Sequence, residues 1–199
     1  MRRPRRFWIQ TTATALGLAP LAGLAVAAAG DRLGANPIET ITHTTGGWAL
    51  RFLLVCLAVT PARRWLGWSW ATPLRRTFGL IAFGYATLHL ATWLVLDLAF
   101  DLDAMLDDLL ERRYIAAGAF AYACLVPLAL TSTRRSMQRL GRRWQTLHRL
   151  VFAAAIAAVV HFVWLVKADL LEPLCYAAAL ALLLGLRLRR PAAPAAPRR

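Results

Sequence analysis

A chain of 199 residues in which 59% of the side chains are hydrophobic and 17% are charged is too apolar for an ordinary soluble domain. A net charge of +14 would suit a nucleic-acid-binding protein if the basic side chains formed a patch on a polar fold, but here they stand in short clusters between apolar runs. The composition therefore predicts an integral membrane protein and argues against nucleic acid as a partner.

Six apolar runs of membrane-spanning length follow one another, which predicts an all-α, polytopic membrane protein with a bundle of six transmembrane helices. Residues 1–6 form a basic tail before the first run, residues 7–30. This layout also suits a signal peptide, but the run is long for one and favours a retained helix. Residues 31–45 are expected to form a polar loop, and the second span is expected over 46–60, ending at Pro61.

Four further spans complete the bundle, and no internal repeat is evident among the six. They are expected over residues 77–98, 114–130, 147–166 and 171–188. Residues 7–190 are thus predicted to form one transmembrane domain. A disordered tail rich in proline and alanine follows over residues 191–199.

The charged residues predict the orientation of the spans. Of the 24 cationic residues, 19 lie on one side of the predicted membrane, and all ten acidic residues lie on the other. By the positive-inside rule the basic side is cytoplasmic, which places both termini in the cytoplasm. Arg51 lies within the second span and is expected to extend its guanidinium toward the near interface.

Two histidines lie inside the predicted spans at matching depth. His89 precedes Asp97, at the outer end of the third span, by eight residues, and His161 precedes Lys167, at the outer end of the fifth, by six. Each is therefore about 9–12 Å from the outer boundary. Two imidazoles on facing helices are the arrangement that a haem needs for its axial ligands. The alternative is that each histidine only makes a hydrogen bond across a helix interface.

A zinc site is disfavoured, because zinc needs three or four close ligands and the outer halves of these helices offer no cysteine or carboxylate. His148 lies at the cytoplasmic end of the fifth span, level with Arg76 on the third. A straight helix would turn His148 about 140° away from the face of His161. A second haem, a contact to a haem propionate or a flavin, and a capping role are all open for His148. His43, in or beside the outer loop, is interpreted as a surface histidine.

Four stretches carry a family resemblance that covers residues 36–190. They are TGGWALRFLLVCLAVTP, LRRTFGLIAFGYATLHL, RRYIAAGAFAYACLVPLALTST and LGRRWQTLHRLVFAAAIAAVVHFVWLVK. Together they resemble the haem-binding membrane subunits of the bacterial periplasmic methionine sulfoxide reductase system, the MsrQ/YedZ family. That family is similar to the transmembrane domains of ferric reductases and NADPH oxidases, which are six-helix b-type cytochromes.

The resemblance implies a ferric-reductase-like bundle in the bacterial inner membrane, with His89, His148 and His161 as the haem-related histidines. It also implies haem b, one or two per chain, and FMN as cofactors. Electrons would come from the quinone pool or a cytosolic flavin reductase and pass to a periplasmic molybdopterin-dependent reductase that repairs methionine sulfoxide in proteins. Relatives with two haems carry paired histidines on both ligand helices, whereas the third span here has only His89.

These expectations describe an electron-transfer subunit rather than a complete enzyme, because the chain has no GxGxxG loop for a nicotinamide cofactor. The acidic outer loops, with Asp101, Asp103, Asp107 and Asp108, are expected to help position the soluble partner. Other possibilities are a ferric-reductase-like or other haem electron-transfer protein, a small proton or metal transporter, and a structural anchor. The transporter is disfavoured because no duplicated half is visible.

Overall fold

The computed structural model describes residues 5–188, and in that part of the chain six helical segments are long and apolar enough to cross a membrane. The protein is therefore a multi-pass, all-α membrane protein, as predicted. The predicted tail over 191–199 and residues 1–4 of the basic tail lie outside the described residues. The elements are α1 Arg5–Ala29, α2 Pro37–Trp65, the 3-10 helix η1 Ser69–Ala71, α3 Leu74–Ala91, the π-helix η2 Thr92–Asp97, α4 Leu102–Glu111, α5 Arg113–Leu130, α6 Arg134–Leu140, α7 Arg142–Leu147, α8 Leu150–Leu165 and α9 Leu171–Leu188.

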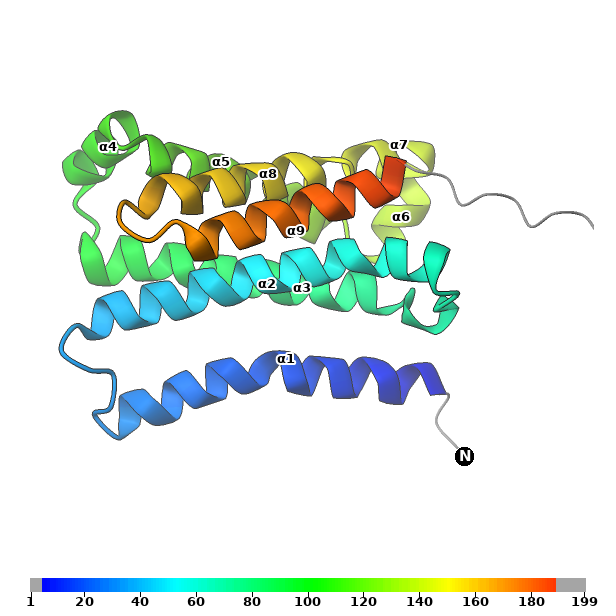
Figure 1. Ribbon diagram of the computed structural model, residues 1–199, viewed down its shortest axis with the longest axis horizontal. Helices are drawn as coiled ribbons and strands as arrows, with labels where there is room; N and C mark the ends of the chain where they lie inside the picture. The colour runs from blue at the N-terminus through cyan, green and yellow to red at the C-terminus, as the bar shows by residue number, and fades with distance from the viewer. Residues whose placement is uncertain (1–4, 189–199) are drawn as a thin grey trace, which may run out of the picture.

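The long helices lie side by side, with α1 along one edge, α2 and α3 beside it, and α5, α8 and α9 on the opposite side (Figure 1). One end of the bundle carries α4 and the connections that precede α2 and α9. All ten acidic residues belong to this end, which we call the acidic end. The other end, with the start of α1, η1, α6 and α7, is called the basic end.

The helix α2 forms the centre of the bundle. Half of its apolar window is buried, whereas only 11–22% of the corresponding window is buried in the other five spans. Leu50, Leu53 and Leu57 from α2 pack with Tyr85 from α3 and Ala154 from α8 in the main core. The other spans keep many apolar side chains exposed, as expected where lipid rather than water surrounds the helices.

The polar stretch before the second span is helical, so α2 is much longer than predicted. Asn36 caps the helix by accepting a hydrogen bond from the Glu39 amide, and Pro37 occupies the first helical position. Threonine hydroxyls in the next two turns bond back to carbonyls of the same helix. The loop predicted over 31–45 was therefore wrong from Pro37 onward.

Pro61 does not end α2, which continues to Trp65. A proline inside a helix removes the amide that would bond the carbonyl four residues earlier, which here belongs to Leu57. Arg187 from α9 supplies a substitute donor, with its Nη2 2.6 Å from the Leu57 oxygen. The prediction that the second span ends at Pro61 was wrong because this donor lies 130 positions further along the chain.

The fifth predicted span is broken near its start. The helix α7 ends at Leu147 and α8 begins at Leu150, so His148 stands in the break between them. The span itself is confirmed, because Arg142–Leu165 is long and apolar enough to cross a membrane, and only its start is interrupted. The angle of about 140° between His148 and His161 assumed a straight helix, and it does not apply across such a break.

Tyr85 fastens α1 to α3 by an unusual hydrogen-bond arrangement. Pro20 interrupts the regular bonding of α1. In the next turn the Tyr85 hydroxyl accepts from the Leu21 amide at 3.0 Å and donates to the Gly17 carbonyl at 2.9 Å. In a regular helix the Leu21 amide would donate directly to the Gly17 carbonyl. The Tyr85 hydroxyl is therefore inserted between the two partners of one backbone hydrogen bond of α1. A Cβ on Gly17 would lie 2.6 Å from Ile81 Cδ1, so α1 approaches α3 closely at this glycine, and a larger residue would displace the end of the Ile81 side chain.

Replacing Tyr85 with phenylalanine is expected to loosen α1 from the bundle. The variant keeps the ring but loses both cross-helix hydrogen bonds, and such bonds between membrane helices contribute about 0.6 kcal/mol on average and up to about 1.7. We expect the Tyr85→Phe protein to unfold at a lower mole fraction of SDS than the parent protein, with a loss of about 1 kcal/mol in the free energy of unfolding. An unchanged unfolding midpoint would show that the Leu21 amide bonds directly to the Gly17 carbonyl when the hydroxyl is absent.

Candidate functional site

His89 on α3 and His161 on α8 come together in the half of the bundle nearer the acidic end. Their ring centroids are 6.0 Å apart, and the ring planes are inclined at 78°. Both side chains are partly buried between helices. The matching depth inferred from the sequence thus corresponds to a close pair of imidazoles on two different helices.

A backbone carbonyl fixes each ring of this pair. His89 Nδ1 lies 3.0 Å from the Thr42 oxygen on α2, and His161 Nδ1 lies 2.6 Å from the Tyr114 oxygen on α5. A carbonyl can only accept, so Nδ1 carries the proton and donates it in both rings. The lone pair of each imidazole is therefore on Nε2, which is the state of a histidine that ligates a metal.

A glycine lies against each ring, one turn after the carbonyl that fixes it. A Cβ added to Gly46 on α2 would be 2.9 Å from His89 Nδ1, and one added to Gly118 on α5 would be 2.8 Å from His161 Nδ1. Neither ring could keep its position beside a larger residue. Sequence reasoning missed both glycines, because their contacts with the rings depend on the packing of α3 and α8.

The two halves of the site are an internal repeat. In each, a carbonyl, a glycine four residues later and a histidine 47 residues after the carbonyl make the same contacts. Tyr114, Gly118 and His161 each lie 72 positions after their counterparts Thr42, Gly46 and His89. No repeat is evident in the sequence, because few side chains are identical between the two halves. The duplicated feature is the histidine site.

The donor set suits a haem better than a bare metal ion. Among the described residues, no group of three or more histidine, cysteine, aspartate or glutamate side chains could hold a metal ion. Two imidazole nitrogens leave a zinc shell incomplete. A porphyrin supplies four equatorial nitrogens and leaves two axial positions, which is what two fixed imidazoles on facing helices can fill. The residues present therefore fit a haem.

His148 lies at the other end of α8 and does not join this pair. Its ring stacks on Trp144 with the centroids 3.8 Å apart, and its Nδ1 lies 3.1 Å from the Trp144 oxygen. Trp144 is itself held by a hydrogen bond of 2.9 Å from its Nε1 to the Thr131 oxygen. The Nε2 atom of His148 is buried and has no partner among the described residues.

Arginines surround His148, although not the one expected. Arg75 is close enough to act electrostatically on both His148 and Arg187. Arg76, which the sequence placed level with His148, instead lines a groove between α1 and α3. Arg187 lies over the Phe152 ring at 5.1 Å, and its buried Nε also lacks a partner in the described part of the chain. We call His148, Arg75 and Arg187 the basic cluster.

The basic cluster combines the exposed Arg75 with the half-buried Arg187, whose Nε is a buried donor without an acceptor among the described residues. All ten acidic residues lie at the opposite end of the bundle, so no carboxylate neutralises these guanidiniums. Buried donors without acceptors are costly, and buried charges are normally paired. Sequence reasoning missed Arg187, whose contacts with Leu57 and Phe152 arise only from the packing of α9.

Two other sequence candidates lie outside these sites. His43 is exposed on α2, with its Nε2 3.8 Å from Glu39, which agrees with the surface interpretation. Arg51 bends toward the acidic end as expected. Its Nε donates to the Tyr176 hydroxyl at 2.7 Å, and its Nη2 lies 3.5 Å from Glu172.

Known proteins match most of the chain. A family model described as "Ferric reductase like transmembrane component" matches residues 45–159. The relatives include proteins named protein-methionine-sulfoxide reductase heme-binding subunit MsrQ from three bacteria. The one from Azospira oryzae is 51% identical over 79% of this chain and 68% of its own length. The one from Rhodospirillum rubrum is 49% identical over 86% of this chain and 83% of its own length. The one from Ralstonia nicotianae is 45% identical over 86% of this chain and 81% of its own length. No solved structure matches the chain.

Proposed function

Because this chain belongs to the MsrQ family of ferric-reductase-like membrane proteins, we propose that it is a b-type cytochrome whose haem is held by Nε2 of His89 and Nε2 of His161. The observation that carries this proposal is the fixed pair of rings, each with its Nδ1 proton donated to a carbonyl. When bound, haem supplies an iron centre that accepts and donates one electron.

The residues around the pair orient and shield the ligands. The carbonyls of Thr42 and Tyr114 fix both tautomers and raise the basicity of the ligating nitrogens. Gly46 and Gly118 keep space for the rings. Since all four groups belong to long membrane helices, the ligands are positioned before the cofactor binds.

The direct test is a dithionite-reduced minus oxidised spectrum of the purified protein after haem-replete expression. The proposal predicts the bands of a low-spin b-type cytochrome, because two imidazoles ligate the iron. A protein without such bands would contradict it.

We further propose that the protein carries electrons outward across the bacterial inner membrane. The donor would be the quinone pool or a cytosolic flavin reductase, and the acceptor a periplasmic molybdopterin-dependent methionine sulfoxide reductase. The positive-inside rule supports this direction, because it places the basic end and both termini in the cytoplasm and the histidine pair near the periplasm.

The helix α4 is the part of the acidic end best suited to meet the soluble acceptor. The Asp108 carboxylate already has partners within the protein, since it lies 2.9 Å from Arg112 and accepts a hydrogen bond from the Trp93 ring at 3.3 Å. Asp101 caps α4. Asp103 and Asp107 are exposed, and their carboxylates make no hydrogen bond or ion pair with other described residues, so they are acids available for docking.

Replacing both Asp103 and Asp107 with asparagine is expected to slow electron delivery to the acceptor. Charge complementarity acts mainly on the encounter rate, so we expect a several-fold slower reoxidation of haem by the acceptor at low salt and little difference at high salt. The haem spectrum should not change. An Asp31→Asn variant, exposed in the loop before α2, is the matched control.

The basic cluster is proposed to hold the second cofactor of the chain. The guanidiniums of Arg75 and Arg187, the latter with an unpartnered Nε, suit an anionic group, either the phosphate of FMN or the propionates of a second haem. His148 is then the residue that contacts this cofactor, with Nε2 as the free ring atom.

A His148→Ala variant is expected to lose FMN or one haem per chain while the haem at His89 and His161 stays bound. The measurement is the molar ratio of FMN and of haem to protein, with His43→Ala as control because His43 is exposed. If both ratios are unchanged, His148 has only the capping role.

A further inference from the structure

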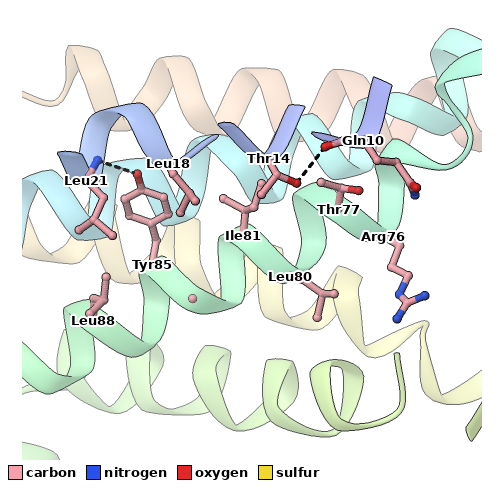
Figure 2. A pocket seen from close by; sticks show the side chains of 11 residues that line it. Gln10, Thr14, Leu18, Leu21, Arg76, Thr77, Leu80, Ile81, Tyr85 and Leu88 are labelled. Atoms are coloured by element: carbon pink, nitrogen blue, oxygen red, sulfur yellow. Dashed lines mark hydrogen bonds between the residues drawn. The ribbon is translucent and has the colours of Figure 1, made fainter. Parts of the chain in front are cut away.

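A groove of about 680 Å³ runs between α1 and α3, away from the histidine pair (Figure 2). Beside the groove, α1 approaches α3 closely where Gly17 meets Ile81 and where the Tyr85 hydroxyl bonds the α1 backbone. Leu18, Leu80 and Leu88 line the groove and are exposed, so it opens to the surrounding membrane.

The groove is polar at one end and apolar along the rest of its length. Gln10, Arg76 and Thr77 gather at the basic end, while Leu21 and Leu88 lie at the other (Figure 2). Arg76 is exposed and makes no hydrogen bond or ion pair to another described residue. Arg6, one helical turn before Gln10, adds a second cation on the same face of α1.

These features match an anionic phospholipid in size and charge. The apolar wall from Thr77 to Leu88 is about 16 Å long at the helical rise per residue. Half of a hydrocarbon core is about 15 Å, so the wall has the length of one leaflet of acyl chains. Arg76 then stands at the level of the headgroup phosphate, where a free guanidinium attracts a negative charge.

We infer that this groove is a binding site for a phospholipid with an anionic headgroup, with the phosphate at Arg76 and an acyl chain along Leu80 and Leu88. A neutral quinone headgroup would leave the guanidinium of Arg76 without a counter-charge. The bound lipid fills the wedge between α1 and α3 and supports the contact that Tyr85 makes with Gly17 and Leu21.

The headgroup is tested by native mass spectrometry of the full-length protein taken from bilayers of equal parts phosphatidylglycerol and phosphatidylcholine with identical acyl chains. About five-fold preferential retention of phosphatidylglycerol is expected, the ratio that one basic side chain near a membrane surface supplies. Arg76→Gln should remove the preference, whereas Arg139→Gln, which neutralises an exposed arginine of α6, should keep it.

The acyl chain is tested by filling the groove. Gly84 lines it, and a Cβ there meets no atom within 4 Å, so Gly84→Phe can occupy the groove without disturbing the helix packing. This variant should retain neither lipid, whereas Gly185→Phe, at an equally open glycine of α9, should behave like the parent protein. Equal retention of both lipids by the parent protein, unchanged retention in Gly84→Phe, or a co-purifying quinone in place of the phospholipid would each overturn the inference.

Discussion

A double variant in which His89 and His161 are both replaced with alanine is expected to contain no haem at the proposed site. The Thr42 and Tyr114 carbonyls are poor ligands for haem iron, and the described residues contain no group of three or more histidine, cysteine or carboxylate side chains that could hold a metal ion instead. Loss of both axial ligands should therefore lower occupancy of this site from one haem per chain to the detection limit.

Haem-to-protein ratios by the pyridine haemochrome method measure this loss. His43→Ala is the matched control, because it removes an exposed histidine from α2 at the same end of the bundle. The basic cluster provides a second comparison, since any haem left in the double variant must depend on His148. The double variant could keep full haem occupancy, and it could still keep it when His148→Ala is added. That result would contradict a role of any of the three histidines as a haem ligand.

The sequence predicted the histidine pair because depth in a membrane can be counted along a helix. His89 and His161 were placed by their distance from charged residues at the span ends, and a rise of about 1.5 Å per residue needs no tertiary information. The number of spans followed from apolar length in the same way. These are local properties, so one sequence was sufficient for them.

The missed features all depend on contacts between distant parts of the chain. The continuation of α2 past Pro61 needs the Arg187 side chain, and the use of Gly46 and Gly118 depends on rings from α3 and α8. The repeat was missed because its two halves share the geometry of their contacts but few residue types. For example, Arg76 in the first half corresponds to His148 in the second, 72 residues later. No count along one helix reveals such relations.

That repeat also explains why the chain has one symmetric histidine pair and not two. The halves agree at His89 and His161, which meet near the acidic end, and differ at Arg76 and His148, which lie toward the basic end. The fold thus repeats the histidine at one position and not at the other. The unpartnered Nε2 of His148 and Nε of Arg187 mark the place where the second half of the arrangement is missing.

Substitutions at the glycine beside each ring are expected to weaken haem binding without destabilising the helix. Gly118→Ala adds a single methyl group that would lie 2.8 Å from His161 Nδ1, so the ring must move and its hydrogen bond to the Tyr114 oxygen must lengthen. Loss of such a supporting contact typically weakens metal binding about 10- to 100-fold. We expect a comparable fall in haem affinity, measured by titrating haem into the apoprotein.

Gly185→Ala is the control that makes this result specific to the ring contact. Both variants replace a helical glycine with alanine, which favours the helix by about 1 kcal/mol in each case, but the Cβ at Gly185 meets no atom within 4 Å. The control should bind haem like the parent protein and unfold no more easily. Because a Cβ added to Gly46 would lie 2.9 Å from His89 Nδ1 in the other half of the repeat, Gly46→Ala should reproduce the Gly118→Ala defect. Equal haem affinity in Gly118→Ala and Gly185→Ala would mean that the carbonyl-fixed rings are not the ligands.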